Sequence, residues 1–333
     1  MKIYFTRDGS GHHSSSLVAK KLCECFSTMG VGVTFNKKDK FHGILAFINV
    51  DDFNLLKKRP VIQRLDGIYF DKDTDYVKRN SGILKTYKES SGIIFQSNVA
   101  KKLVFSIFGE TKKPFEIIHN GTYINTIGNS EKFLLDKKPE IYSKLIKFEK
   151  RIICCGKFRK IKRLPSIISG SYEYIKNNKN TALYIIGTIE GDEERDALNK
   201  YSSLSENIIY LGKQENDVVR NIQSMCDVGI SLSFVDACPS SVIEQLVYGV
   251  PVVSTKFQGT NELFNEDSGV VMDVDDWNYS PIRYRDIKQI DPLLTAKAIE
   301  KCFIIGKREV RKDLDVSLMA KKYATFIKGV IGT

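Results

Sequence analysis

Residues 229–255 read GISLSFVDACPSSVIEQLVYGVPVVST, and this stretch decides the predicted fold. Its first five residues form an apolar run that is typical of a buried parallel strand. A loop ending at Pro239 follows, and then a short helix that Ser240 or Ser241 is expected to cap. Gly249 occupies the place where a left-handed residue ends a helix, and the apolar residues after it predict a second buried strand. The stretch is therefore a strand–loop–helix–strand unit.

Units of this kind bind ligands at the carboxyl end of the first strand. The helix N-terminus there offers free N–H groups and the positive end of a dipole, which suit a phosphate. Asp236 precedes this helix and Glu244 lies eight positions later, so two carboxylates frame the site. We expect a sugar nucleotide, with the diphosphate on the helix N-terminus and the carboxylates accepting hydrogen bonds from sugar hydroxyls. The alternative is an N-capped helix with two solvated carboxylates.

Length and composition indicate a globular protein of two domains, because 333 residues are many for one core. No run of eighteen apolar residues is present, and the first residues are typical of a strand instead of a signal peptide. Seven scattered cysteines without a C-x-x-C pair indicate reduced core thiols. We therefore expect a cytoplasmic protein that is at most peripheral to a membrane.

Positive charge is concentrated in the first half of the chain. Residues 1–150 hold 26 Lys and Arg against 16 Asp and Glu, whereas the remainder holds 25 against 24. This asymmetry suggests an anionic partner such as a lipid-phosphate surface, an acidic glycan or a nucleic acid. The alternative is a compositional bias, because the chain is rich in Lys, Asn and Ile throughout.

Apolar runs and helical patterns alternate along the chain, which predicts parallel sheets covered on both faces. Expected strands outside the opening unit lie at residues 2–5, 43–49, 60–65, 92–96, 115–118, 151–155, 182–187, 208–212 and 269–272. Helices are expected from Ser14 and from near Ser97, and residues 130–150, which are charged and weakly periodic, are expected to connect the domains. The predicted limits are 1–149 and 150–310, with a final helix in 311–333 that crosses back to the first domain.

Two further loops have the composition of phosphate sites. Gly9 and Gly11 lie in a polar loop between the first strand and the first helix, which predicts either a phosphate loop or a plain tight turn. Gly156 opens the run GKFRKIKR after a strand of the second domain. A glycine turn followed by Lys157 and Lys162 suits a pyrophosphate, because these cations can neutralise charge on a leaving phosphate. The alternative is a basic surface loop.

Together these motifs resemble the retaining family-4 glycosyltransferases, which have the GT-B fold of two Rossmann-like domains facing each other across a cleft. The family has a Gly-Arg-Leu turn followed by a lysine, and here Gly156, Lys157 and Lys162 stand at that spacing. Its strand ending in glycine is matched at Gly187, and its Leu-Gly strand end at Leu211. Two acidic residues separated by seven positions and followed by Gly-x-Pro-Val-Val are its signature, matched by Asp236, Glu244 and residues 249–253. Gly259 and Glu262 match its downstream Gly-x-x-Glu.

The first half resembles the family less specifically. Residues 64–67 (RLDG), 95–97 (FQS) and 118–121 (IHNG) match recurring elements in order and spacing. Many family members place a histidine near the reaction centre in this domain. In this chain Asp66 is expected in that area, while His119 belongs to a different motif.

The resemblance implies a role for each of these residues. Glu244 is expected to bind the ribose, and Asp236 to hold the transferred sugar. Lys157 and Lys162 neutralise the diphosphate, and Asp66 faces the acceptor, which makes Lys157, Lys162, Asp236 and Asp66 the catalytic set. The donor-binding set is Gly9, Gly11, Gly187, Leu211, Cys238, Pro239, Ser240, Ser241, Val242 and Glu244.

The implied reaction transfers a sugar, with retention, from a UDP- or GDP-sugar to a hydroxyl of a glycan, a lipid-linked acceptor or a protein. No cofactor or metal is expected, because the cations and helix N–H groups stabilise the phosphate charge and the chain has no Asp-x-Asp motif. A peripheral contact with an anionic membrane surface is also expected.

Two other functions are alternatives. A non-hydrolysing sugar-nucleotide epimerase would have the same fold with acid and base residues in the cleft. A nucleic-acid-binding module would use the basic first half, but aromatic residues do not interleave with the basic ones there as an RNA-binding sheet requires. No nucleic acid is therefore expected as a partner.

Overall fold

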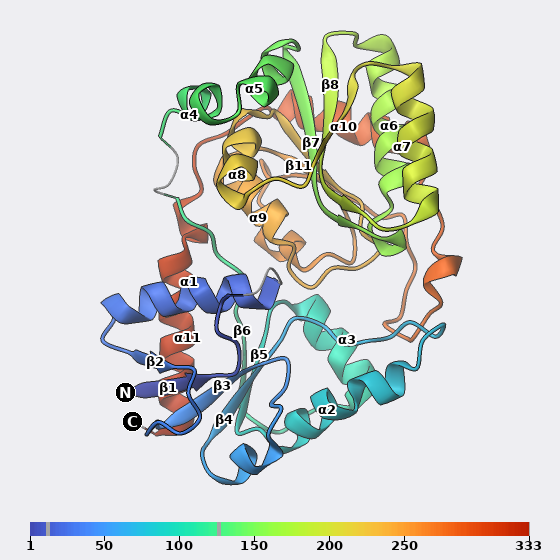
Figure 1. Ribbon diagram of the computed structural model, residues 1–333. Coiled ribbons are helices and arrows are strands. Elements are labelled where there is room, and N and C mark those ends of the chain that lie inside the picture. The colour runs from blue at the N-terminus through green and yellow to red at the C-terminus, as the bar shows by residue number, and fades with distance from the viewer. Residues whose placement is uncertain (11–13, 125–127, 333) are drawn as a thin grey trace.

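The computed structural model describes residues 1–10, 14–124 and 128–332, which form two α/β domains, one above the other (Figure 1). Each domain contains a six-stranded sheet in which all pairings are parallel. The predicted architecture of two doubly wound domains is confirmed.

The first sheet has the order β2-β1-β3-β4-β5-β6. Its strands are β1 (Lys2–Phe5), β2 (Gly32–Thr34), β3 (Gly43–Phe47), β4 (Val61–Leu65), β5 (Gly92–Phe95) and β6 (Phe115–Ile117). The sequence did not predict β2, because this edge strand has three residues, of which only Thr34 is buried. Its helices are α1 (Ser14–Thr28), the short 3-10 helix η1 (Phe53–Lys57), α2 (Tyr76–Glu89) and α3 (Asn98–Phe108).

The second sheet has the order β12-β11-β10-β7-β8-β9. Its strands are β7 (Lys150–Phe158), β8 (Thr181–Ile189), β9 (Ile208–Gly212), β10 (Val228–Ser231), β11 (Val252–Thr255) and β12 (Gly269–Met272). The helices around it are α4 (Ser130–Lys137), α5 (Pro139–Ile146), α6 (Leu164–Asn177), α7 (Asp192–Leu204), α8 (Asn216–Met225), α9 (Ser240–Val247) and α10 (Pro292–Ile305). Short 3-10 helices lie at η2 (Lys160–Lys162), η3 (Gly259–Leu263), η4 (Tyr284–Asp286) and η5 (Lys312–Leu314).

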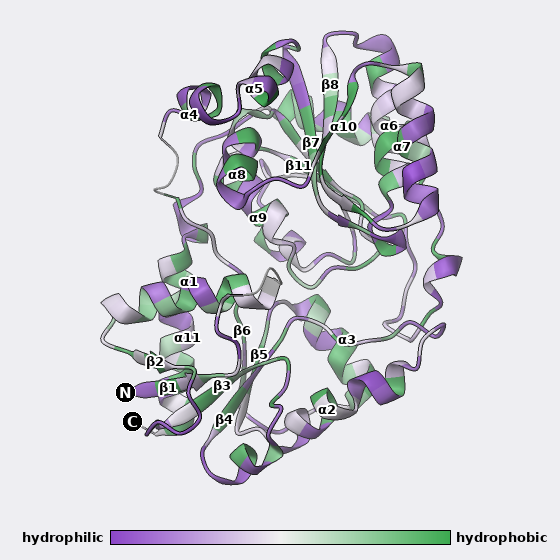
Figure 2. Cartoon of the chain, viewed as in Figure 1, coloured by the Kyte–Doolittle hydropathy of each residue, from purple (hydrophilic) through white to green (hydrophobic). Residues whose placement is uncertain are grey.

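Apolar side chains cover both faces of each sheet. Figure 2 shows hydrophobic residues along the strands. In the first domain α1 and the final helix α11 (Val316–Ile331) pack on one face, while α2 and α3 pack on the other. In the second domain α6, α7 and α10 cover one face, and α4, α5, α8 and α9 cover the other. Burial of both faces explains why the strands are continuous apolar runs in the sequence.

Two connections join the domains on one side. Residues 130–150 were expected to connect the domains. Most of this range forms α4 and α5, whose Leu134, Ile141 and Leu145 pack with the second sheet. The final helix α11 instead packs on the first sheet, where Tyr323 and Ile327 are fully buried. The chain therefore passes between the domains twice, and the limits 1–149, 150–310 and 311–333 remain a prediction.

A third connection, on the opposite side, was not predicted. We call residues 273–291, which lie between β12 and α10, the strap. The strap meets the first domain where Ile282 pairs with Asp71 in an isolated parallel bridge. Its Trp277 packs in an apolar cluster that also contains Phe70 of the first domain and Phe234 of the second. The two domains thus share an aromatic core.

No helix among the described residues is both long and apolar enough to span a bilayer. The seven cysteines are unpaired thiols, and Cys154, Cys226, Cys238 and Cys302 are buried.

Candidate active site

The loop between β10 and α9 lies at the carboxyl edge of the second sheet and is held by its neighbours. Phe234 N–H donates to the carbonyl of Ile161 at 2.8 Å, and Asp236 N–H donates to the carbonyl of Phe257 at 3.1 Å. Asp236 Oδ1 accepts from the N–H of Cys238 at 3.2 Å, which closes a tight turn before the helix. These bonds fix the loop in front of α9.

The structure brings Lys162 and Asp236 together, as the sequence analysis expected of the donor site. Lys162 ends the 3-10 helix η2, and its Nζ forms an ion pair with Asp236 Oδ2. Both side chains are partly exposed, so the pair is open to a ligand. A cation and a carboxylate therefore stand beside the N-terminus of α9.

The N-terminus of α9 differs from the prediction in one respect. The N-cap residue is Pro239, which provides no side-chain hydrogen bond, so capping by Ser240 or Ser241 was wrong. The cause is Pro239, whose fixed φ of −62° fits the position before the first turn. The first N–H groups of a helix have no intrahelical acceptor, and these two partly exposed serines provide the N–H groups at this end. Gly249 has a φ of +69°, as expected of a left-handed residue after a helix.

Several predicted donor-site residues have side chains in the core. Cys238 and Val242 pack in the apolar cluster around α9, and Leu211 packs in the cluster beneath α8. Burial raises the pKa of the Cys238 thiol to about 12, so it is neutral. The side chains of these residues are therefore not available to a ligand.

The turn predicted at Gly156 is wrong, because β7 continues through Phe158 and the chain turns only afterwards. Gly156 pairs with Gly187 of β8, and a Cβ on Gly187 would lie 1.8 Å from the carbonyl oxygen of Gly156. Glycine is needed here because two strand backbones approach closely. Lys157 consequently projects from a strand, and its Nζ pairs with Glu190 Oε1 at 2.6 Å.

Glu244 lies on the second turn of α9 among positive charges from both domains. Burial raises the pKa of Glu244, and the nearby charges of Lys21 and Arg220 act in the opposite direction. Lys21 belongs to α1, which lies below α8 and α9 in Figure 1, and its Nζ donates to the carbonyl of Gly121 at 2.9 Å. Lys21 and Arg220 were not predicted as site residues, because a single cation on an amphipathic helix does not indicate a binding site.

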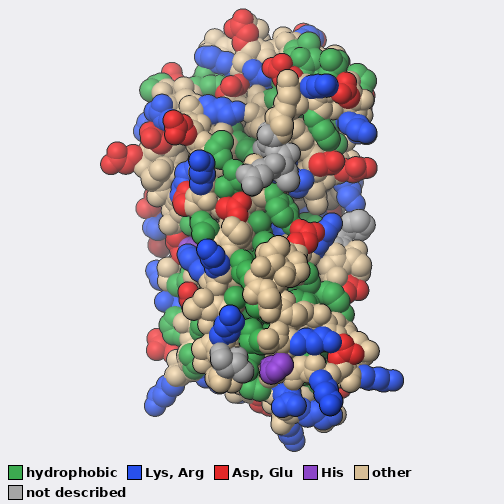
Figure 3. Space-filling view, turned by 90° about the vertical axis from the view of Figure 1, so that its left-hand side faces the viewer, with side chains coloured by type: hydrophobic (Ala, Val, Ile, Leu, Met, Phe, Trp, Pro, Cys, Tyr) green, Lys and Arg blue, Asp and Glu red, His purple; other side chains and the backbone are tan. Residues whose placement is uncertain are grey.

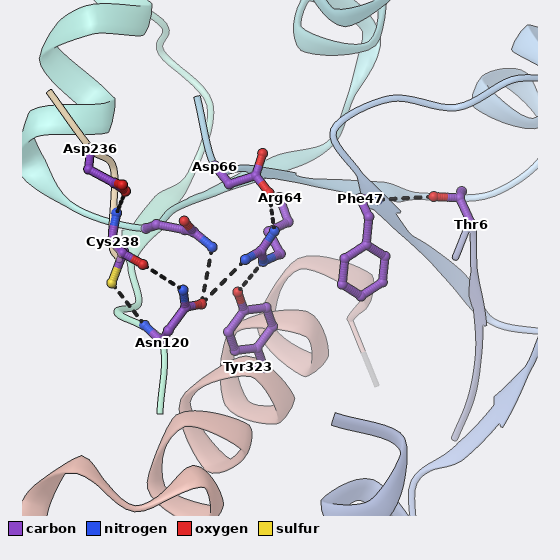
Figure 4. Close-up of polar contacts among 9 residues, drawn as sticks. Thr6, Phe47, Arg64, Asp66, Asn120, Asp236, Cys238 and Tyr323 are labelled. Carbon is purple, nitrogen blue, oxygen red and sulfur yellow. Dashed lines mark hydrogen bonds and ion pairs between the residues drawn. The ribbon is translucent and has the colours of Figure 1, made fainter. Parts of the chain in front are cut away.

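On the first domain, Asp66 contacts a fully buried arginine. Arg64 Nη1 donates to Asp66 Oδ2 at 3.0 Å, and Arg64 Nε donates to the hydroxyl of Tyr323 at 3.1 Å (Figure 4). The third contact of the guanidinium runs from Nη2 to Asn120 Oδ1 at 3.3 Å. Two polar residues, Gln63 and Arg64, in an otherwise apolar strand were the signal that could have identified this network.

His119 and Glu262 meet between the domains, although they come from different predicted motifs. His119 Nε2 lies 3.0 Å from Glu262 Oε2, and the same carboxylate accepts from the N–H groups of Asn98 (3.0 Å) and Val99 (3.2 Å). Burial raises the pKa of Glu262, but these hydrogen bonds outweigh it and hold the pKa below its ordinary value. Glu262 thus joins the second domain to the N-terminus of α3.

The glycine loop of the first domain is described only in part. Gly9 has a φ of +77° and lies against Lys20 of α1, as a tight turn requires. Gly11 lies outside the described residues.

A family match falls on the second domain. Residues 137–280 match the family model of glycosyl transferases group 1. This region includes β7 to β12 and therefore contains Lys162, Asp236 and Glu244.

One curated protein is similar in sequence, N-acetyl-alpha-D-glucosaminyl L-malate synthase of Bacillus anthracis. The identity is 26% over 191 residues, which cover 55% of this chain and 48% of that protein. The chain thus matches about half the length of this relative.

Solved structures match the whole chain in fold. HepE of Anabaena, in complex with UDP and glucose, has a TM-score of 0.68 at 16% identity and covers 99% of this chain and 100% of its own. The sucrose-phosphate synthase of Thermosynechococcus elongatus has a TM-score of 0.68 at 11% identity, covering 100% of this chain and 99% of its own. The architecture is therefore the GT-B fold.

Proposed function

We propose that this chain is a retaining glycosyltransferase that moves a sugar from a nucleotide-sugar donor to a hydroxyl group. The observation that carries the proposal is the ion pair of Lys162 and Asp236 beside the N-terminus of α9. A cation and helix N–H groups suit a diphosphate, and a carboxylate beside them suits a sugar hydroxyl. HepE is described in complexes with UDP and with UDP-glucose, which makes uridine nucleotides the first donors to test.

In the proposed mechanism the protein positions the reactants and stabilises phosphate charge. Lys162 and the N–H groups of Ser240 and Ser241 bind the diphosphate as negative charge develops on it. Asp236 accepts hydrogen bonds from the transferred sugar, and Glu244 from the ribose. The leaving diphosphate takes the proton of the acceptor hydroxyl on the same face of the sugar, so the anomeric configuration is retained.

Lys157 and Asp66, the other two residues expected to be catalytic, have different proposed roles. Lys157 pairs with Glu190, so it contributes to diphosphate binding only after that ion pair opens. Asp66 is held by Arg64 at the first-domain side, and we propose that it faces the acceptor hydroxyl. A glycan, a lipid-linked sugar or a protein provides that hydroxyl.

The experiment incubates the protein with UDP-glucose and other UDP- and GDP-sugars, and follows the products by proton NMR. We expect slow release of the sugar in the anomeric form of the donor before mutarotation, with the nucleoside diphosphate as coproduct. Appearance of a second sugar nucleotide would instead indicate an epimerase. Activity is expected to persist in EDTA, and its loss in EDTA with recovery on adding Mg²⁺ or Mn²⁺ would contradict the metal-independent mechanism.

We also propose that the basic surface of the first domain binds an anionic membrane. Lys37, Lys38 and Lys40 lie in the exposed turn after β2. The ion pair of Lys37 with Asp52 (3.7 Å) places this turn beside the η1 segment with its exposed basic residues. Figure 3 shows Lys and Arg side chains at the lower end of the molecule.

Flotation with vesicles tests this contact. Vesicles containing phosphatidylglycerol should carry the protein at low salt and lose it at high salt, whereas phosphatidylcholine vesicles should not bind it. Equal behaviour with both lipids would contradict the proposal.

A further inference from the structure

The buried side chain of Asn120, in the first domain, contacts residues 236–239 of the second domain. We call these residues the donor loop. Its Nδ2 donates to the carbonyl oxygen of Cys238 at 3.0 Å (Figure 4). Its backbone N–H points to Cys238 Sγ at 3.4 Å. Asn120 is 5% exposed and Cys238 is 4% exposed, so water does not compete for these contacts.

Hydrogen bonds from two side chains of the first domain fix the orientation of the Asn120 amide. Its Oδ1 accepts from Arg64 Nη2 at 3.3 Å and from Gln96 Nε2 at 3.1 Å. A guanidinium has only donors, so the oxygen must face Arg64 and the NH₂ group must face Cys238. Arg64 is itself fixed by Tyr323 and Asp66, so the amide has one favourable orientation.

Cys238, which accepts the hydrogen bond from Asn120, is linked in turn to residues of the proposed donor site. The carbonyl of Cys238 immediately precedes Pro239, the N-cap of α9. The N–H of Cys238 donates to Asp236 Oδ1, whose second oxygen pairs with Lys162. A displacement of the Cys238 peptide would therefore move both Asp236 and the start of α9.

We propose that Asn120 is a positioning residue that holds the loop of residues 236–239 in its donor-binding conformation. This inference rests on the proposed function and extends it, because it makes the donor site depend on a side chain of the opposite domain. Arg64 acts on the loop indirectly, because it fixes the orientation of the Asn120 amide. An incorrectly placed first domain would thus leave the phosphate and sugar contacts of the second domain disordered.

The test is the substitution Asn120→Asp, which keeps the size of the side chain and an acceptor for Arg64 and Gln96. It replaces the donating NH₂ with an oxygen that repels the carbonyl of Cys238. We expect nucleoside diphosphate binding, measured by calorimetry, to weaken about tenfold or more, as for a lost hydrogen bond with an unpaired buried acceptor. Asn120→Ala, which adds no charge, should weaken binding in the same direction and provides the test if the aspartate variant does not fold.

The matched control is Asn80→Asp in α2. Asn80 is buried, and its Nδ2 also donates to a backbone carbonyl, that of Tyr69 at 2.6 Å, but it has no contact with the donor loop. This variant should lose stability and retain nucleotide affinity in its folded form, as judged by near-ultraviolet circular dichroism. Two folded Asn120 variants that bind within twofold of the wild type would overturn the positioning role alone. A wild type that binds no nucleoside diphosphate would overturn the proposed function and this inference with it.

Discussion

The ammonium group of Lys162 is the charge on which the proposed chemistry depends most. It lies beside Asp236 at the N-terminus of α9, where a leaving diphosphate would gain negative charge. Lys162→Ala should lower turnover by about 10²-fold or more at saturating donor, in line with the loss of one preorganised charge contact. The control is Lys160→Ala, two residues earlier on the same 3-10 helix, where the side chain pairs with Glu193. Equal turnover of the two variants would show that Lys162 does not stabilise the charge of the leaving diphosphate.

Glu244 allows a second prediction at this scale. A partly buried carboxylate that binds a ribose makes charge-assisted hydrogen bonds, each contributing about 1.5–3 kcal/mol. Glu244→Gln should therefore weaken nucleoside diphosphate binding by about tenfold to a hundredfold. The matched ligand is the 2′-deoxynucleotide, which should bind worse than the ribonucleotide to the wild type and equally to the variant. Unchanged discrimination by Glu244→Gln would show that this carboxylate does not contact the ribose.

Single residues also show which parts of the site sequence reasoning can reach. The expectation that Lys162 and Asp236 share one site came from the family resemblance, and the structure pairs the two side chains. The position of Lys157 did not follow, because Gly156 permits a close strand pairing where a turn was expected. The contact of Asn120 with the donor loop could not be predicted, since it forms only after both domains have packed, and Arg64 acts on that loop only through Asn120.

At the scale of elements, the strap depends on a buried ion pair. Arg163, in a left-handed conformation with a φ of +52°, pairs with Asp275, and both side chains are nearly inaccessible. Removing one partner of a buried pair leaves an uncompensated charge and costs about 3–5 kcal/mol. Asp275→Asn should therefore lower the free energy of unfolding by about 3 kcal/mol in urea denaturation. Asp276→Asn, at the exposed neighbouring residue, is the control, and an equal small effect of both variants would contradict this account of the strap.

The strap also shows why elements differ in how well they can be predicted. The edge strands β9 and β12 were predicted with their observed bounds, because each is an uninterrupted apolar run in the sequence. The strap has little regular structure and no periodicity, and its place is determined by contacts with Asp71 and Phe70 of the other domain. Contacts between distant segments leave no periodic pattern in the sequence.

At the scale of the whole molecule, Glu262 couples the domains in a pH-dependent way. Its pKa is lowered in the folded protein, so the carboxylate stabilises the fold above its unfolded value of about 4.3. This contribution should be lost as the pH falls from there through the lower folded pKa. The free-energy difference between the wild type and Glu262→Gln should thus be constant near neutral pH and shrink below about pH 4.3, as measured by urea denaturation. A difference that is independent of pH would contradict the assignment.

The central claim is that a nucleoside diphosphate binds between the loop after β7 and the N-terminus of α9. The most direct measurement is a thermal-shift titration with UDP, GDP, ADP and CDP, because a ligand at a hundred times its Kd adds about 2.7 kcal/mol of stability. We predict that at least one nucleoside diphosphate raises the melting temperature of the wild type, and that Lys162→Ala greatly reduces this shift. No shift with any of the four nucleotides, from a protein that melts cooperatively, would contradict the claim.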